Sequence, residues 1–146
     1  MSIHPIIQAR ILSGRYPTDK LCRHWTYNRT GLCILQGCNG ESLGSLEHLL
    51  LSCPALQPSR HTSIDFLLSV AQEYPIVNTL IMDILCTTDT SLVMQFLLDC
   101  STLPRVISLV QTHGTCVLSI LFRATRNWCY SLHRKRMIIL GLYQYR

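Results

Sequence analysis

The chain has 146 residues, of which 48% are hydrophobic and 14% are charged, and its formal net charge is +5. This composition favours a packed globular protein and argues against intrinsic disorder. No uninterrupted apolar run approaches the roughly 18 to 20 residues that span a bilayer, and the N-terminal residues lack the pattern of a secretory signal. We therefore expect no membrane span and an intracellular location, nuclear or cytoplasmic.

The charge is unevenly distributed along the chain. Residues 1–30 carry five basic residues and one acidic residue. Residues 31–122 carry two basic and seven acidic residues, and residues 123–146 carry six basic residues and no acidic residue. Basic ends around an acidic middle indicate a surface that faces a polyanion. Ordinary solvated charges that cluster by chance would produce the same pattern.

The chain begins with residues that indicate two short helices. Isoleucines at positions 3, 7 and 11 fall on one helical face, and Gly14 ends that segment. Thr18 is placed to cap a second short helix over 19–25.

A glycine-rich loop follows. Residues 28–44 hold four glycines and two cysteines, which indicates turns and a small β-hairpin. Ser45 is placed to cap a helix that begins at Leu46 and ends by Cys53, because a proline comes next.

Four potential metal ligands lie in and after this loop. Cys33, Cys38, His48 and Cys53 have the spacing C-x4-C-x9-H-x4-C. Zinc prefers a tetrahedron of thiolate and imidazole ligands, and three cysteines with one histidine form a common closed set. A closed set leaves no open coordination position, so we expect a structural Zn²⁺ ion. Alternatively, the cysteines are small buried hydrophobes and the histidine lies on the surface.

The remaining cysteines and histidines give weaker signals. Cys22 with His24, and separately His61, lie near the four residues and are alternative ligands. Cys86, Cys100, Cys116 and Cys129 fall on predicted helices without paired spacing, so we expect all four to be core thiols.

From about residue 61 the apolar residues recur at helical spacing. Successive faces are Ile64, Leu67, Leu68 and Ala71; Val77, Leu80, Ile81 and Ile84; Val93, Phe96, Leu97 and Cys100; and Val117, Ile120, Leu121, Ala124 and Trp128. Pro75 and Pro104 are placed to start new helices, and Gly114 is the expected interruption of the last helical stretch, 104–140. We therefore predict a mainly α fold, with a small zinc-stabilised loop or hairpin module at 1–60 and a helical bundle with a basic C-terminal helix at 61–146.

Three segments of the N-terminal region resemble a known family. The strings QARILSGRYPTDKLCRHW (8–25), GLCILQGC (31–38) and LEHLLLSCPAL (46–56) are similar to the segment after the polymerase domain in LINE-type, non-long-terminal-repeat retrotransposon reverse transcriptases. The resemblance covers about residues 3–61. In that family a CCHC zinc knuckle follows a basic, tryptophan-containing helix, so the resemblance implies ligand roles for Cys33, Cys38, His48 and Cys53.

The resemblance also implies a function. The family's tail is expected to hold the element's RNA, or target DNA, during target-primed reverse transcription, with a polymerase domain upstream as its partner. The nine-residue gap between Cys38 and His48 is longer than in retroviral knuckles, so the nucleotide contacts of those knuckles do not carry over. The chain lacks the paired aspartates of a polymerase and the carboxylate cluster of an endonuclease. We therefore expect a non-catalytic fragment of a longer protein.

Basic and aromatic residues at both ends are the candidate nucleic-acid contacts. They are Arg15, Tyr16, Lys20, Arg23, Trp25 and Arg29 near the zinc module, and Arg123, Arg134, Lys135 and Arg136 on the last helix. Cations neutralise phosphates and aromatic rings stack on unpaired bases, so RNA or single-stranded nucleic acid is the expected partner. Core packing is the alternative for Tyr16 and Trp25, and an ordinary solvated face is the alternative for the last helix.

Other interpretations stay open. The apolar helices after residue 61 would make the chain a zinc-and-helix protein-interaction domain if they bind a partner. The basic C-terminal helix would bind a membrane surface in a further alternative. A degenerate element fragment without function is also compatible with the sequence.

Overall fold

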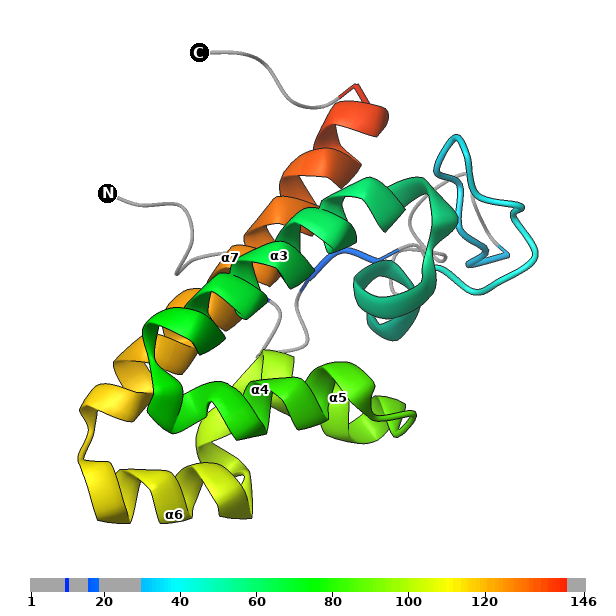
Figure 1. Cartoon of the computed structure of the whole chain (residues 1–146). Helices are drawn as coiled ribbons and strands as arrows, with labels where there is room; N and C mark the ends of the chain where they lie inside the picture. The colour runs from blue at the N-terminus through cyan, green and yellow to red at the C-terminus, as the bar shows by residue number, and fades with distance from the viewer. Residues whose placement is uncertain (1–9, 11–15, 19–29, 142–146) are drawn as a thin grey trace.

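The computed structural model describes Arg10, residues 16–18 and residues 30–141 (Figure 1). Its helices are η1 (His48–Ser52), η2 (Pro54–Leu56), α3 (Gln57–Glu73), α4 (Pro75–Cys86), α5 (Thr90–Asp99), η3 (Cys100–Thr102), α6 (Pro104–His113) and α7 (Cys116–Ile139). Across these ranges the β-type pairing is a single isolated antiparallel bridge between Leu32 and Leu43. The predicted mainly α class is confirmed. The helices expected over 3–11 and 19–25 lie outside the described residues, apart from Arg10.

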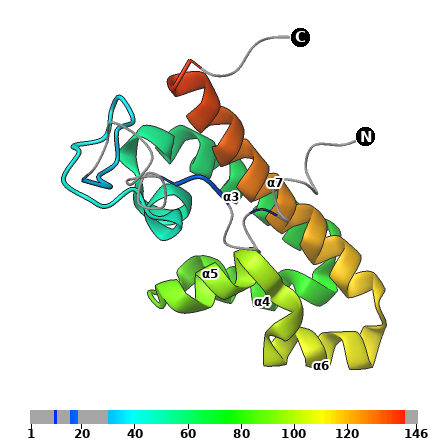
Figure 2. The same cartoon turned by 180° about the vertical axis from the view of Figure 1, so that it is seen from behind.

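Helices α3 and α7 form the long axis of the bundle. They lie side by side in both views, and the shorter helices α4, α5 and α6 pack across the end where α3 finishes and α7 begins (Figures 1 and 2). Buried side chains from all five α-helices meet in one hydrophobic core, among them Leu67, Ile81, Phe96, Val106 and Leu121. These residues follow the helical spacing of the sequence because each helix turns one apolar stripe toward the core.

Prolines and a glycine set several helix boundaries. Pro75 and Pro104 stand in the first turns of α4 and α6, as predicted, because a first-turn residue has no helical amide bond to lose. Gly114, with a φ of 89°, separates α6 from α7. Helix α3 starts at Gln57 rather than near residue 61, since Pro58 is tolerated in its first turn. The boundary predicted at residue 60 therefore falls inside α3. The division of the chain into a loop module and a helical bundle stays a prediction.

The loop region and the bundle pack against one another. Trp128 of α7 donates its indole N–H to the backbone oxygen of Leu50 at 3.2 Å, and both residues are buried. Leu35 and Leu56 belong to the same hydrophobic core as the bundle residues. The segment that carries the candidate ligands is thus anchored on α7.

The four helical cysteines divide into two pairs. Cys100 and Cys129 are buried, and burial raises the pKa of each thiol to about 12, so both are unreactive core thiols as expected. Cys86 and Cys116 are exposed, so the expectation of a core position was wrong for these two. Cys86 is the last residue of α4 and Cys116 the first of α7, where the helices leave the packed interior.

Among the described residues, one stretch meets the length and hydropathy criteria for a membrane span. It is Thr90–His113, which is 24 residues long; an 18-residue segment of it has a mean hydropathy of 1.3 and is 28% buried. The stretch consists of α5, η3 and α6, with Leu103 between the last two. Length and composition alone select it, and core helices of globular proteins meet the same criteria. The expectation of no membrane span therefore stays a prediction.

Candidate metal centre

A tight turn brings the first two cysteines together. The backbone N–H of Cys38 donates to the oxygen of Leu35 at 3.0 Å and closes a four-residue turn. Gly37, the third residue of this turn, has a φ of 96°, a conformation that type II turns require and that glycine adopts without strain. Gly37, the second glycine of the sequence GLCILQGC, thus determines how the chain folds back between the two sulfur atoms.

Two backbone hydrogen bonds close the base of the loop. The N–H of Cys33 donates to the backbone oxygen of Ser42 at 2.9 Å, and the N–H of Gly44 donates to the backbone oxygen of Gly31 at 2.8 Å. They flank the Leu32–Leu43 bridge, which lies where the sequence predicted a small hairpin. Cys33 consequently has a defined position at the start of the loop.

A π-helical turn brings the other two ligands together. The N–H of His48 donates to the Ser45 hydroxyl at 3.2 Å, so Ser45 caps the helical segment that begins at Leu46, as predicted, and continues into the π-helical turn. The N–H of Cys53 donates to the oxygen of His48 at 2.7 Å, which is a bond between residues five apart. In an α-helix, residues five apart point in different directions, whereas the wider π turn brings them to the same side. This geometry places His48 beside Cys53.

The four candidate side chains converge on one point. Their ligand atoms all lie within 4.8 Å of one another. The Sγ atoms of Cys33 and Cys53 are 3.8 Å apart, and the Sγ of Cys38 is 3.6 Å from the Nε2 of His48. A tetrahedron with zinc–sulfur distances of about 2.3 Å and zinc–nitrogen distances of about 2.0 to 2.1 Å has edges of about 3.8 Å and 3.6 Å. The group can therefore hold a metal ion.

The cysteines of the cluster are free thiols; Cys33 and Cys53 are buried, and Cys38 is partly exposed. The 3.8 Å between Cys33 and Cys53 is far longer than the about 2.05 Å of a disulfide bond. Burial raises the pKa of the Cys33 thiol to about 12 and also raises the pKa of Cys53. A cation between the sulfur atoms would favour the thiolates and oppose this effect of burial.

Two further residues support the cluster, and the sequence analysis missed both. Ser52 lies with its hydroxyl 3.3 Å from the Nδ1 of His48, which leaves Nε2 directed at the sulfur atoms. Its position four residues after His48 on a predicted helix was a usable signal. Arg60 donates from Nη2 to the backbone oxygen of Cys53 at 2.6 Å. No spacing in the sequence indicated this contact.

The alternative ligands do not join the group where the structure describes them. His61 lies on α3 and is exposed, and the metal-binding group contains the four predicted residues without it. Cys22 and His24 lie outside the described residues.

Two of the candidate nucleic-acid contacts are buried. Tyr16 is 5% exposed, and its hydroxyl lies 2.8 Å from the Nδ1 of His133. Arg136 is also 5% exposed, donates to the backbone oxygen of Pro17 at 2.8 Å and lies over the Tyr16 ring. Both side chains therefore lie in the interior, where they hold residues 16–18 on α7, and their role as nucleic-acid contacts stays a prediction. Arg136 follows Leu132 by four residues and so continues the buried face of α7.

The other candidates on α7 face outward to different degrees. Arg123 and Arg134 are exposed and Lys135 is partly exposed. The guanidinium carbon of Arg123 lies 5.7 Å from the ring centre of Phe66, and that of Arg126 lies 6.0 Å from the ring centre of Phe122. Arg15, Lys20, Arg23, Trp25 and Arg29 lie outside the described residues.

The metal centre is defined by the geometry of this chain's own residues. Three thiols and one imidazole from a hairpin-like loop and a π-helical turn form a closed group that can hold a metal ion. In comparisons with known proteins, no family model, no curated protein and no solved structure matches the chain.

Proposed function

We propose that Cys33, Cys38, His48 and Cys53 bind one structural Zn²⁺ ion. The observation that carries the proposal is the approach of their four ligand atoms to within 4.8 Å of one another. Three sulfur atoms and one imidazole nitrogen suit zinc, whereas Mg²⁺ and Ca²⁺ prefer oxygen ligands. All four coordination positions are supplied by the chain, so the ion acts by holding the loop on η1.

Elemental analysis and metal substitution test this proposal. Protein purified without added metal should contain about one equivalent of zinc, because such sites bind zinc tightly at neutral pH. Replacement by Co²⁺ should produce the strong visible absorption of a tetrahedral thiolate site, and Cys53→Ser should abolish it. Cys86→Ser, which changes an exposed cysteine outside the cluster, should leave both measurements unchanged. A metal-free protein with unaltered folding would contradict the proposal.

We further propose that the zinc-stabilised chain binds RNA or single-stranded nucleic acid, as the tail of a LINE-type reverse transcriptase. The support is the resemblance over residues 3–61 together with the basic outer face of α7. Arg123 and Arg134 are exposed, and Arg123 lies against the ring of Phe66. A planar cation beside an aromatic ring suits a ligand that offers both phosphates and bases.

A salt titration tests the nucleic-acid proposal. Each phosphate neutralised on a single strand contributes about −0.7 to the slope of log affinity against log salt. Replacing Arg123, Arg134 and Lys135 together with Ala should make the slope shallower by up to about two units and weaken all sequences alike. Arg105→Ala is the control, because Arg105 is exposed but paired with Asp83 in the acidic middle of the chain. Affinity that does not change with salt in the zinc-loaded protein would contradict the proposal.

A further inference from the structure

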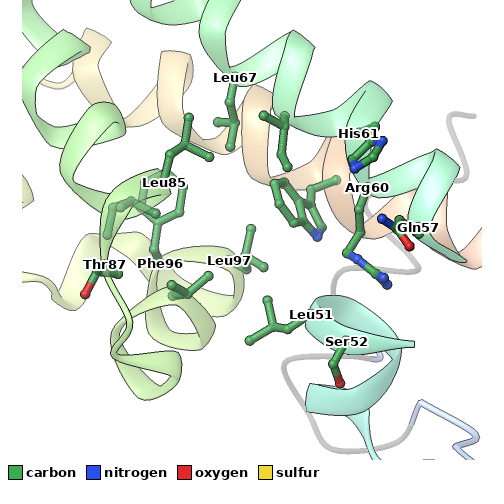
Figure 3. A pocket seen from close by; sticks show the side chains of 14 residues that line it. Leu51, Ser52, Gln57, Arg60, His61, Leu67, Leu85, Thr87, Phe96 and Leu97 are labelled. Atoms are coloured by element: carbon green, nitrogen blue, oxygen red, sulfur yellow. The ribbon is translucent and has the colours of Figure 1, made fainter. Parts of the chain in front are cut away.

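A cavity lies between the metal centre and the bundle. It has a volume of about 430 Å³ and is bounded by η1, the first half of α3, the end of α4, α5 and α7 (Figure 3). Sites for small molecules have volumes of about 300 to 1,000 Å³. The cavity therefore has the size of a binding site for a small molecule.

Apolar side chains form most of the cavity wall, and most of its polar groups lie on one side. The apolar part consists of Leu51, Ile64, Leu67, Ile84, Leu85, Val93, Phe96, Leu97 and Trp128. Ser52, Gln57, Arg60 and His61 lie together on one side, opposite Leu85 and Phe96 (Figure 3). A long apolar wall with polar groups gathered at one end suits a ligand with a polar head and an apolar body.

Arg60 is the unusual member of the polar side. It is 8% exposed, and its Nη2 donates to the backbone oxygen of Cys53 at 2.6 Å. Among the described residues, the ion pair found joins Arg105 to Asp83 and does not involve Arg60. No Asp or Glu is among the residues that line the cavity, so the Arg60 guanidinium gives the polar side a positive charge. An anionic oxygen would complement that charge.

We propose that this cavity binds an elongated apolar small molecule that ends in an anionic oxygen group, a carboxylate or a phosphate ester. The head accepts a hydrogen bond from the guanidinium of Arg60, and the apolar body lies against Leu67, Phe96 and Leu97. A cationic head is disfavoured by the guanidinium, and a neutral head forgoes the charge-assisted hydrogen bond. The site is separate from the nucleic-acid surface proposed on α7 and does not depend on it.

Matched ten-carbon ligands test the head group. Decanoate and decyl phosphate stand for the two anionic sources, decanol for a neutral head and decylamine for a cationic one. Binding to the full zinc-loaded chain is followed by isothermal titration calorimetry, below the micelle concentration of each ligand. At least one anionic ligand should bind at one per chain, about 10-fold tighter than decanol, as expected for a hydrogen bond to a charged group. Decylamine should bind more weakly still.

Two variants separate the site from general hydrophobic binding. Arg60→Met keeps the apolar stem and should remove the preference for the anionic head. Val93→Trp is on α5, away from the candidate metal ligands, and should weaken the binding of all four ligands by narrowing the cavity, while the zinc content stays unchanged. Arg105→Met, at a different surface, should bind as the unaltered chain does. Should Arg60→Met not fold, the head-group series and Val93→Trp decide the question.

Three outcomes would overturn the proposal. They are equal affinity for decanoate, decyl phosphate and decanol, unchanged binding in Val93→Trp, and no saturable binding of either anionic ligand to the zinc-loaded chain.

Discussion

The metal loop, residues 30–56, and the helical bundle, residues 57–141, are ordered by different means. In the loop, one turn, one bridge and one π-helical turn converge on four ligand atoms. Ile34 and Leu43 of the loop are 54% and 44% exposed, so its tip adds little to the core. In the bundle, five helices bury apolar faces against one another, and order is spread over many contacts.

The difference predicts how each region responds to change. Removing one ligand from a four-ligand site removes the ion and every constraint that depends on it. Removing one core side chain from the bundle weakens one of many contacts, so the response is graded. The predictions below run from the loss of a whole region to a change at a single supporting hydrogen bond.

Cys53→Ser should have the largest effect. Zinc binding contributes about 10 to 16 kcal/mol in zinc-finger peptides, so its loss should unfold the loop. Hydrogen exchange should show lost protection over 31–53, with protection retained in α4 and α7. Cys86→Ser is the control and should retain protection in both regions. Uniform loss of protection across the chain would show that the two regions do not differ in this way.

Leu121→Ala should destabilise the bundle by about 2 to 5 kcal/mol, because Leu121 is fully buried and its truncation leaves a cavity. Urea unfolding followed by far-UV circular dichroism measures the change, and the zinc content of the folded protein should be unaltered. Ile107→Ala, at a side chain that is 45% exposed, should change the stability by less than about 0.5 kcal/mol. Similar losses from both variants would contradict the described core.

Arg136→Met should cost about 1 to 3 kcal/mol of stability, because it leaves the Pro17 oxygen without this donor and removes a cation from the Tyr16 ring. Arg134→Met, at an exposed neighbour, should cost less than about 0.5 kcal/mol and should weaken RNA binding more than Arg136→Met does. Thermal unfolding and fluorescence anisotropy measure the two effects. A larger loss of RNA binding from Arg136→Met than from Arg134→Met, with a smaller loss of stability, would support Arg136 as a nucleic-acid contact.

Ser52→Ala should have the smallest effect. Loss of the hydroxyl beside the Nδ1 of His48 should lower the metal affinity about 10-fold, equivalent to about 1.4 kcal/mol, and leave the stoichiometry unchanged. Competition with a zinc chelator measures the affinity. Ser91→Ala on α5 is the control, and an equal loss there would exclude a specific role for Ser52.

Much of the bundle could be predicted from local sequence patterns. Val77, Leu80, Ile81 and Ile84 recur at helical spacing, and all four are buried in α4. Pro104 and Gly114 marked the limits of α6 because both act through the backbone of their own residue. The start of α3 was missed, since the turn before it ends in a short 3-10 helix that continues directly into the α-helix.

The four candidate metal ligands were also predictable, because their chemistry and their spacing are both local. Cys33 and Cys38 are joined by one turn, and His48 and Cys53 by another. The roles of Tyr16 and Arg136 were not predictable in the same way. These residues are 120 positions apart in the sequence and come together through the packing of the N-terminal segment on α7.

The sequence by itself determined the helical class and the identity of the candidate ligand set, because periodicity and short spacings act within a few residues. The tertiary structure alone decided which basic and aromatic side chains are exposed, since that depends on which elements meet. It also decided that Arg60 joins the metal centre to a cavity walled by α5 and α7. Contacts of this kind depend on residues distant in the chain, and no local pattern encodes them.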